Sequence, residues 1–452
     1  MLADLSRALP GLAVTAPQAH HLRDVGAEQR GIAGSASAVI LPRDAEQVQE
    51  AVACCYGRDL PIVPRGGGSG LAGGAVPERG AVVLDLTGLD RFRSFEPEQL
   101  RVHVEAGVRT SEVQRRARES GLLFPPDPGA PEQSTVGGNV ATNAGGPHAY
   151  RYGSTGAWVN EIEAVIANGE RVVVGGPSRK WVEGLDLKSL LVGSEGALGV
   201  ITAARLRLAP APEAAFPVAA VFTSEEEGCA AVQGLVASAV ACSVLDFADA
   251  DAFGPLRASL GAESVPDGFL LLMEVDGSAA EASRLRKELL DFVAATATWT
   301  FAPLDLGGIR SLWGWRDDMS VRLASVYGGK VSEDIVVPVE RLGEAIARVR
   351  GIGRRLGLQT ACWGHAGDGN LHAALFAPDA DADRLALARS GGEEVLAMSR
   401  ELGAGLSGEH GIGLFKRDMM ASTTSPPLTA VLSGVRVAFD PKGLFNPGKV
   451  LP

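Results

Sequence analysis

The stretch PRGGGSGLAGG at residues 64–74 decides how the first half of the chain is interpreted. Apolar β-type runs flank it at 60–63 and 81–86, and a helical pattern capped by Asp44 precedes the first run. The sequence therefore predicts a helix, a strand, a glycine loop and a second strand in succession. Because glycine has no Cβ, such a loop can bring successive backbone N–H groups close to a phosphate.

The flanking sequence excludes two common nucleotide-binding motifs. GSGLAG at residues 68–73 matches the letters of the dinucleotide pattern G-x-G-x-x-G, with Asp85 downstream. That pattern needs a helix after the loop, but only residues 74–80, which include Pro77, precede the next strand. A Walker loop is excluded because no Gly-Lys-Ser/Thr follows. A pyrophosphate loop and a tight surface loop remain as alternatives.

Three later segments rich in small residues favour the pyrophosphate loop: PPDPG at 125–129, STVGGNVATNAGG at 134–146 and GSEGALGVI at 193–201. Together with the glycine loop they resemble the FAD-binding domain of the vanillyl-alcohol oxidase and p-cresol methylhydroxylase superfamily, over residues 38–208. The resemblance implies an α+β fold. It consists of a two-subdomain FAD-binding domain of the p-cresol methylhydroxylase type and an α+β substrate domain with an antiparallel sheet.

The same resemblance implies FAD as cofactor. Several branches of the superfamily attach the flavin covalently to a histidine in the first loop, where this chain has serine and glycine, so we expect non-covalent FAD. The residues implied to bind it are Pro64, Gly66, Gly67, Gly68, Ser69, Gly70, Pro128, Thr135, Gly138, Asn143, Gly145, Glu195, Gly199, Val200, Ile201 and Asn446.

Length predicts more than one domain for this chain of 452 residues. We expect the FAD-binding domain at 1–210, a substrate- and metal-binding domain at 211–434, and a tail at 435–452 that returns to the first domain. The Pro- and Ala-rich stretch at 209–217 predicts a hinge between the two domains.

Charge and cysteine content narrow the function classes. A net charge of −12 argues against binding to nucleic acid, which needs a basic surface. Five cysteines, an odd number, predict a reducing compartment, and we expect a cytoplasmic protein. The sequence contains no run of about 18 uncharged apolar residues, so we expect no transmembrane segment.

Two short histidine motifs mark the second half. In GHAGDGNLH at 364–372 the glycines disfavour a helix, which predicts His365 on a turn and His372 on the following strand. In SGEHGIG at 407–413, Glu409 and His410 are neighbours. Two imidazoles and one carboxylate form a common set of divalent-metal ligands. A hydrogen-bonded structural role is the alternative for each histidine alone, and the clustering favours metal binding.

Other residues near these motifs are expected to be structural. We predict that Asp368 and Asn370 form the turn, that Cys362 is a small buried residue, and that Trp313 and Trp315 pack rather than react.

The motifs resemble the C-terminal domain of the FAD-linked D-2-hydroxyacid dehydrogenases, a group that includes D-lactate dehydrogenases, D-2-hydroxyglutarate dehydrogenases and the flavin subunit of glycolate oxidase. The resemblance implies that His365, His372 and Glu409 bind zinc or manganese and that His410 is the base. It also implies that Arg316 binds the substrate carboxylate, with an exposed surface arginine as the alternative.

The expected reaction follows from the chemistry of alcohols. The hydroxyl proton must be removed as a hydride leaves the carbon, and a metal on the oxygen brings its pKa toward the range of an imidazole base. We expect oxidation of a small D-2-hydroxy acid to the 2-oxo acid, with the hydride passing to the flavin. Alternatives are a polyol-oxidising FAD oxidase, a flavoprotein of non-redox ether-lipid synthesis and the flavin subunit of a multi-protein glycolate oxidase.

Two positions bear on the substrate. Members of the resembled family that act on D-2-hydroxyglutarate share a lysine and an asparagine at two positions. This chain has Ser332 and Ala374 there. A second substrate carboxylate would lack these partners, so D-lactate or glycolate is favoured. Lys330, two residues from Ser332, is the alternative partner, and D-2-hydroxyglutarate therefore stays open.

The partners expected are a small anionic hydroxy acid and an electron acceptor that the sequence does not specify, whether an electron-transfer protein, a cytochrome or a quinone. A homodimer and a subunit of an oxidase complex, attached to a membrane through its partner, are both open.

Overall fold

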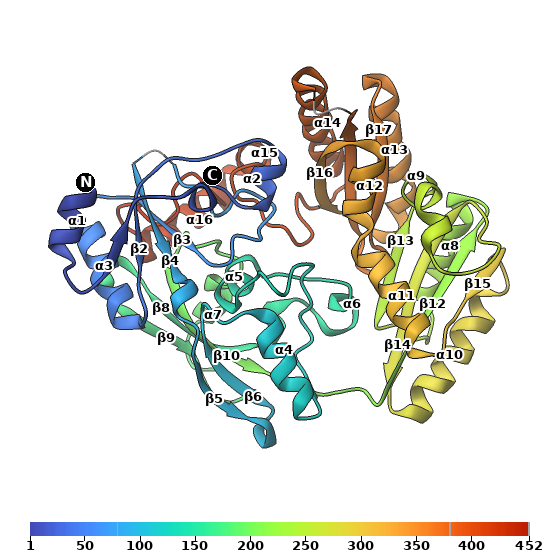
Figure 1. Ribbon diagram of the computed structural model, residues 1–452, viewed down its shortest axis with the longest axis horizontal. Helices are drawn as coiled ribbons and strands as arrows, with labels where there is room; N and C mark the ends of the chain where they lie inside the picture. Colours follow the sequence, from blue (N-terminus) through green and yellow to red (C-terminus); the bar gives the residue numbers. More distant parts are fainter. Residues whose placement is uncertain (79, 379–380, 451–452) are drawn as a thin grey trace. The chain divides into compact units, whose positions relative to one another are not determined.

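The computed structural model describes residues 1–78, 80–378 and 381–450, and Figure 1 shows its elements. It divides into two compact units. The first contains residues 1–146, 153–211 and the segment from 409 onward, and the second contains residues 147–152 and 212–408. The predicted domain boundaries differ from these units at 147–152, at 211 and at 409–434, and they stay a prediction.

The first unit begins with a four-stranded sheet in the order β1-β2-β4-β3. Its strands are β1 (Ala13–Thr15), β2 (Ala36–Leu41), β4 (Ala81–Asp85) and β3 (Ile62–Arg65). Helix α3 (Ala45–Tyr56) begins as predicted, because the Asp44 carboxylate accepts a hydrogen bond from the Gln47 N–H. Helices α1 (Leu2–Ala8) and α2 (Val25–Gln29) precede it.

The glycine loop joins β3 to β4, as predicted. The two strands are parallel neighbours, and the residues described between 66 and 80 form no helix. Their connection is therefore a long loop in place of a crossover helix, which confirms that the dinucleotide pattern is a coincidence of letters.

A second sheet of the first unit has the order β5-β6-β10-β8-β9, and all its pairs are antiparallel. Its strands are β5 (Phe92–Glu96), β6 (Arg101–Glu105), β10 (Val200–Arg207), β8 (Val159–Val165) and β9 (Arg171–Gly175). Short strands β7 (Leu122–Leu123) and β11 (Ala209–Pro210) pair beside it. The helices of this part are α4 (Thr110–Glu119), α5 (Val136–Thr142) and α7 (Leu187–Leu191).

The C-terminal segment completes the core of the first sheet. After α15 (Arg417–Thr423) and α16 (Pro426–Phe439), residues 444–446 run beside β3, where Ile62 bonds to the backbone of Leu444 and Asn446. Phe445 is fully buried in that core and packs against Tyr56. Asp440 accepts hydrogen bonds from the Tyr56 hydroxyl and the Phe445 N–H.

The second unit contains a seven-stranded sheet in the order β15-β12-β14-β13-β17-β18-β16. Every pair is antiparallel, as predicted. The strands are β12 (Ala214–Phe222), β13 (Val244–Ala248), β14 (Phe269–Gly277), β15 (Trp299–Phe301), β16 (Gly329–Val336), β17 (Gln359–His365) and β18 (Asn370–Ala377).

The predicted hinge at 209–217 contains the division between the two units and overlaps the start of a strand. Strand β12 begins at Ala214 and pairs with β14 along its whole length. Pro217 is accommodated because β15 pairs only with residues 219–221, so the other side of Pro217 is a strand edge that needs no N–H donor.

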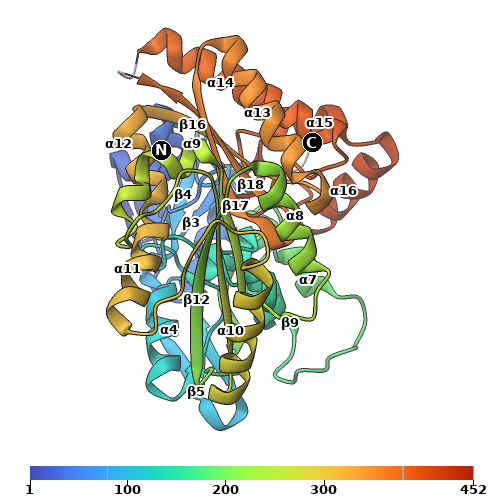
Figure 2. The ribbon, with the colours of Figure 1, turned by 90° about the vertical axis from the view of Figure 1, so that its right-hand side faces the viewer.

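Helices cover both faces of this sheet. On one face lie α8 (Glu225–Val236), α10 (Ala279–Val293), α13 (Leu342–Leu356) and α14 (Ala382–Glu401), with α10 along the sheet in Figure 2. On the opposite face lie α9 (Ala250–Phe253), α11 (Leu306–Asp317) and α12 (Met319–Tyr327), which share a core with Ala361, Ala374 and Phe376. Short α6 (Ala149–Tyr152) joins this unit through a bond from the Tyr152 hydroxyl to Asp276. None of the helices in the described part of the chain is both long and apolar enough to span a bilayer.

The buried tail gives a stability prediction. Phe445→Ala removes a ring from a closed core and should lower the free energy of unfolding by about 3–5 kcal/mol, measured by urea denaturation. Leu428→Ala on α16, which is 51% exposed, should change it by less than about 0.5 kcal/mol. Equal effects of the two changes would contradict the packing of the tail.

Candidate active site

Several backbone N–H groups of the glycine loop have no acceptor among the described residues. The carbonyls of Gly68 and Gly70 accept hydrogen bonds from the N–H groups of Val25 and Gly26 in α2. The described residues offer no acceptor to the N–H groups of Gly66, Gly67, Gly68 and Ser69. A row of backbone donors without protein acceptors suits the oxygens of a pyrophosphate.

Glycine is required in this loop by space as well as by conformation. A Cβ on Gly67 would lie 1.8 Å from the Gln133 carbonyl oxygen, and one on Gly66 would lie 2.3 Å from Thr135 Oγ1. Gly68 has φ +69°, in the left-handed region. The loop therefore packs directly on the start of α5, where Thr135 caps the helix by accepting from the Gly138 N–H.

Other residues predicted to bind FAD lie on three further segments of the first unit. Asn143 ends α5 in the left-handed conformation, and its Oδ1 accepts from the Gly156 N–H. The Val200 and Ile201 side chains are buried in the two cores of this unit, so these two residues would offer a ligand their backbone. Pro128, Gly145 and Gly199 complete this set, and their role stays a prediction.

Asn446 and Glu195 are joined by a hydrogen bond. The Asn446 amide donates to the carbonyls of Gly74 and Glu195, and its Oδ1 accepts from Lys449. The Glu195 carboxylate accepts from the N–H groups of Ile412 and Gly413 at 2.7 and 2.8 Å. Burial raises the pKa of Glu195 to about 7, although these N–H groups act to lower it.

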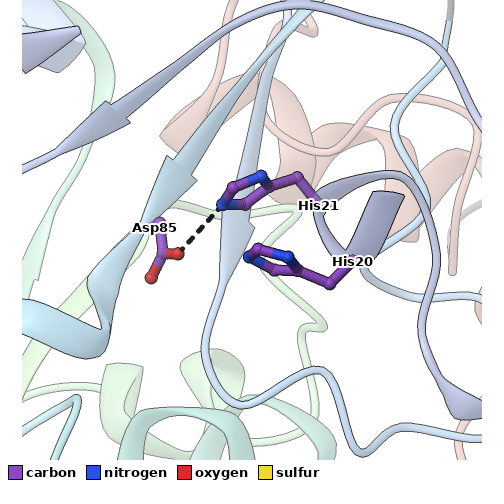
Figure 3. A group of neighbouring side chains, drawn as sticks. All are labelled: His20, His21 and Asp85. Carbon is purple, nitrogen blue, oxygen red and sulfur yellow. Dashed lines mark ion pairs between the residues drawn. The ribbon is translucent and has the colours of Figure 1, made fainter. Parts of the chain in front are cut away.

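A second histidine pair, His20 and His21, lies beside Asp85 in the first unit (Figure 3). His21 Nδ1 accepts from the Gln18 N–H at 2.9 Å, so its proton sits on Nε2, which faces Asp85 Oδ2 at 3.5 Å. With both nitrogens used, His21 has no lone pair left for a metal. Asp85 also caps the turn after β4 by accepting from Thr87, so the group is structural.

In the second unit, neighbouring strands bring the two predicted metal histidines together. His365 is the last residue of β17 and His372 lies in β18, with ring centroids 6.0 Å apart. The prediction that His365 lies on the turn is wrong by one residue, because strand pairing continues to His365 and the turn is Ala366–Asp368. Metal–nitrogen bonds of about 2 Å allow both rings to reach one cation.

Asp246 holds the first histidine. This β13 residue pairs with His365 across the strands, and its carboxylate lies 2.7 Å from His365 Nδ1, a contact that orients the imidazole ring. The same carboxylate accepts from Arg316 Nε at 2.8 Å. Burial acts to raise the pKa of Asp246, but the adjacent His365 and Arg316 outweigh it and hold that pKa below its usual value. Arg316 is thus a half-buried, ion-paired residue of α11 and not an exposed one.

Asp334 organises the other side. It lies opposite His372 in the β16–β18 pairing, 3.9 Å from its Nδ1. Its carboxylate accepts from the Asn370 amide, the Ser407 hydroxyl and the Gly408 N–H at 2.6, 2.7 and 3.0 Å. Asn370 was predicted to be a turn residue. It is instead a buried strand residue bound to Asp334, and its Oδ1 meets no partner in the described part of the chain.

Glu409 and His410 follow Gly408 directly in the chain and open the last segment of the first unit. Their side chains face one another, with His410 Nε2 3.6 Å from Glu409 Oε1. Gly408 leaves no room for a side chain, because a Cβ there would lie 1.9 Å from the Asn370 amide nitrogen.

Lys330 lies on the sheet face that carries His372 and Asp334. Its Nζ donates to the Ser320 carbonyl and hydroxyl at 3.0 and 2.6 Å and lies 4.9 Å from the centre of the Trp363 ring. Burial lowers its pKa to about 8. Cys362 is fully buried, and burial raises the pKa of its thiol well above the usual value.

Sequence reasoning missed Asp246 and Asp334. Asp246 is the one charged residue of the otherwise apolar strand VLDFA at 244–248, whereas Asp334 lies in the mixed strand GKVSEDIV at 329–336. A charge in an apolar run is costly to bury without a partner, and that was the one available signal. Their partners come from other strands and could not be identified from local pattern.

The fold and the glycine loop together define a flavoprotein of the p-cresol methylhydroxylase type. Residues 36–175 match the model of an FAD binding domain, and residues 211–450 match the C-terminal domain of FAD linked oxidases. The chain therefore belongs to the FAD-linked oxidases and is an oxidoreductase with an FAD-binding domain.

Individual proteins agree with this family. The chain is 30% identical to the glycolate oxidase subunit GlcD of Bacillus subtilis over 91% of its own length and 88% of the relative's. It is 31% identical to a D-lactate dehydrogenase of Anaerostipes hadrus, over 90% and 87%. A structure of p-cresol methylhydroxylase shares the fold with a TM-score of 0.78 at 18% identity, over 92% of this chain and 89% of that one.

The crowded glycine loop gives a cofactor prediction. Gly67→Ala should abolish retention of FAD through purification, because its Cβ would collide with the Gln133 carbonyl, and the ratio of absorbance at flavin and protein wavelengths measures the loss. Gly129→Ala is the matched control, since a Cβ there meets nothing within 4 Å. Full FAD content in the Gly67 variant would contradict the assignment of this loop.

Proposed function

We propose that this protein oxidises a short D-2-hydroxy acid to the 2-oxo acid, with non-covalent FAD as the hydride acceptor and a divalent metal, zinc or manganese, as activator. The observation that carries the proposal is the group of His365, His372, Asp246 and Arg316 on one sheet face of an FAD-linked oxidase. The names of the two relatives support a hydroxy acid as substrate.

The donor set fits a metal. Two buried imidazoles, one oriented by a carboxylate on its far nitrogen, match the usual arrangement of metal-binding histidines. Glu409 would be the third ligand. Its place in the chain supports this role, because Gly408 is anchored to Asp334 beside His372 and consecutive Cα atoms lie about 3.8 Å apart.

Each group of the chain then has a distinct task. When bound, the metal supplies a positive charge that lowers the pKa of the substrate hydroxyl, and FAD supplies the acceptor for the hydride from C2. His410, next to Glu409, would accept the hydroxyl proton. Arg316 would bind the substrate carboxylate, while Asp246 orients the guanidinium by accepting from Nε.

The reaction is tested by anaerobic mixing of the FAD-loaded enzyme with D- and L-2-hydroxy acids. D-lactate or glycolate should bleach the flavin absorbance, L-lactate should not, and a chelator should slow the bleaching until zinc or manganese is restored. Bleaching by L-acids alone, or by none of the panel with metal present, would overturn the proposal.

The metal site has its own test. His372→Ala should lower the metal content and slow flavin reduction by at least about 100-fold, because losing a ligand costs no less than losing its supporting partner. His103→Ala, in β6 of the first unit, should leave both quantities unchanged. Normal metal content in the His372 variant would exclude that residue as a ligand.

Substrate length is the finer part of the proposal. Ser332 and Ala374 offer no charge to a second carboxylate, and the Lys330 ammonium is already bound to Ser320, which favours D-lactate or glycolate. The double change Ser332→Lys and Ala374→Asn should therefore raise kcat/KM for D-2-hydroxyglutarate by at least about tenfold, the size of one charge-assisted bond, in a steady-state assay. A wild-type enzyme that already prefers D-2-hydroxyglutarate would contradict the short-substrate proposal.

A second candidate is the flavin subunit of a multi-protein oxidase. The subunit name of the Bacillus relative supports it, and the same site would then pass electrons to a partner subunit, a cytochrome or a quinone. Gel filtration of cell extract, followed by flavin absorbance, distinguishes a free cytoplasmic monomer or homodimer from a complex held at a membrane through its partner.

A further inference from the structure

Glu195 is a buried carboxylate that connects several segments of the first unit. Its side chain accepts from the Ile412 and Gly413 N–H groups, and its carbonyl accepts from the Asn446 amide. Its N–H donates to the Ala141 carbonyl at the end of α5, so its backbone is also fixed. The residue has φ +48°, a conformation that needs such support in a residue other than glycine.

The segment that Glu195 holds is rich in glycine and has few side chains to pack. Residues 408–413 have the sequence GEHGIG, and they form no helix or strand. Gly411 brings its backbone so close to Glu195 that a Cβ would lie 2.6 Å from Oε1. Gly413 similarly lies against Ala72 of the glycine loop, with a Cβ 2.1 Å from the Ala72 carbonyl oxygen. Hydrogen bonds must therefore fix this backbone.

We propose that Glu195 is a positioning residue whose carboxylate, through the N–H groups of Ile412 and Gly413, fixes the backbone that carries Glu409 and His410. This inference rests on the proposed function for the roles of those two residues. The sequence-based expectation that Glu195 binds the cofactor stays a prediction, and the structure adds that each of its carboxylate oxygens accepts from a backbone N–H group.

The same contacts connect the glycine loop to the segment that carries Glu409 and His410. Gly74, at the end of the glycine loop, lies against the same carboxylate, with a Cβ 3.4 Å from Glu195 Oε2. Asn446 ties Gly74 to the Glu195 backbone. A catalytic group displaced by about 1 Å can lose on the order of 100-fold in rate, so a base carried by a glycine segment depends on such anchors.

The test compares Glu195→Gln with Glu161→Gln, a control that changes a carboxylate of the same unit whose bond is to Arg205. A glutamine keeps the shape but places an NH2 group against one backbone N–H, so one of the two bonds is lost. Amide hydrogen exchange of the FAD-loaded enzyme should show Ile412 and Gly413 exchanging on the order of tenfold faster, with α16 unchanged. The kcat of the variant should fall by about 10- to 100-fold, while KM and FAD content stay near those of the wild type.

Gly411→Ala provides a second variant if the first folds poorly, because its Cβ would push the carboxylate away from the same bonds. The effects on kcat should not add in the double variant. Faster exchange with normal kcat, or a lower kcat with unchanged exchange at Ile412 and Gly413, would overturn the positioning role. Failure of the proposed function is distinguishable, because the wild-type enzyme would then show no flavin reduction at all.

Discussion

Hydrogen bonds from backbone N–H groups to buried carboxylates hold the glycine-rich segments of this protein in place. Asp334 holds Gly408, Glu195 holds Ile412 and Gly413, and Asp440 holds Phe445 in the tail. Glycine segments have few side chains to pack, so a hydrophobic core cannot position them. These bonds satisfy backbone donors that would otherwise be buried without partners.

The same principle separates the tasks of the two units. The first unit uses glycines to expose backbone donors in the loop after β3, which suits the phosphates of FAD. The second unit uses a rigid antiparallel sheet to fix the rings of His365 and His372, each beside an aspartate of a neighbouring strand. Backbone groups would serve the cofactor, whereas side chains on strands would serve the chemistry that we propose.

The local sequence pattern is sufficient to predict part of this structure. The cap at Asp44, the strands around the glycine loop and the antiparallel second sheet follow from the sequence and its family resemblance. Strand pairing was not predictable, because it depends on residues far apart in the chain. For that reason the roles of Asp246 and Asp334, the strand position of His365 and the early start of β12 appear only in the structure.

In the proposed reaction the hydrogen on C2 of a D-2-hydroxy acid passes to the flavin while the chain removes the hydroxyl proton. The decisive measurement is the rate of flavin reduction after rapid mixing with D-lactate that carries deuterium at C2, compared with ordinary D-lactate. We expect slower reduction with the deuterated acid and a further loss of rate when the metal is chelated. Equal rates for the two acids, unaffected by the chelator, would contradict it.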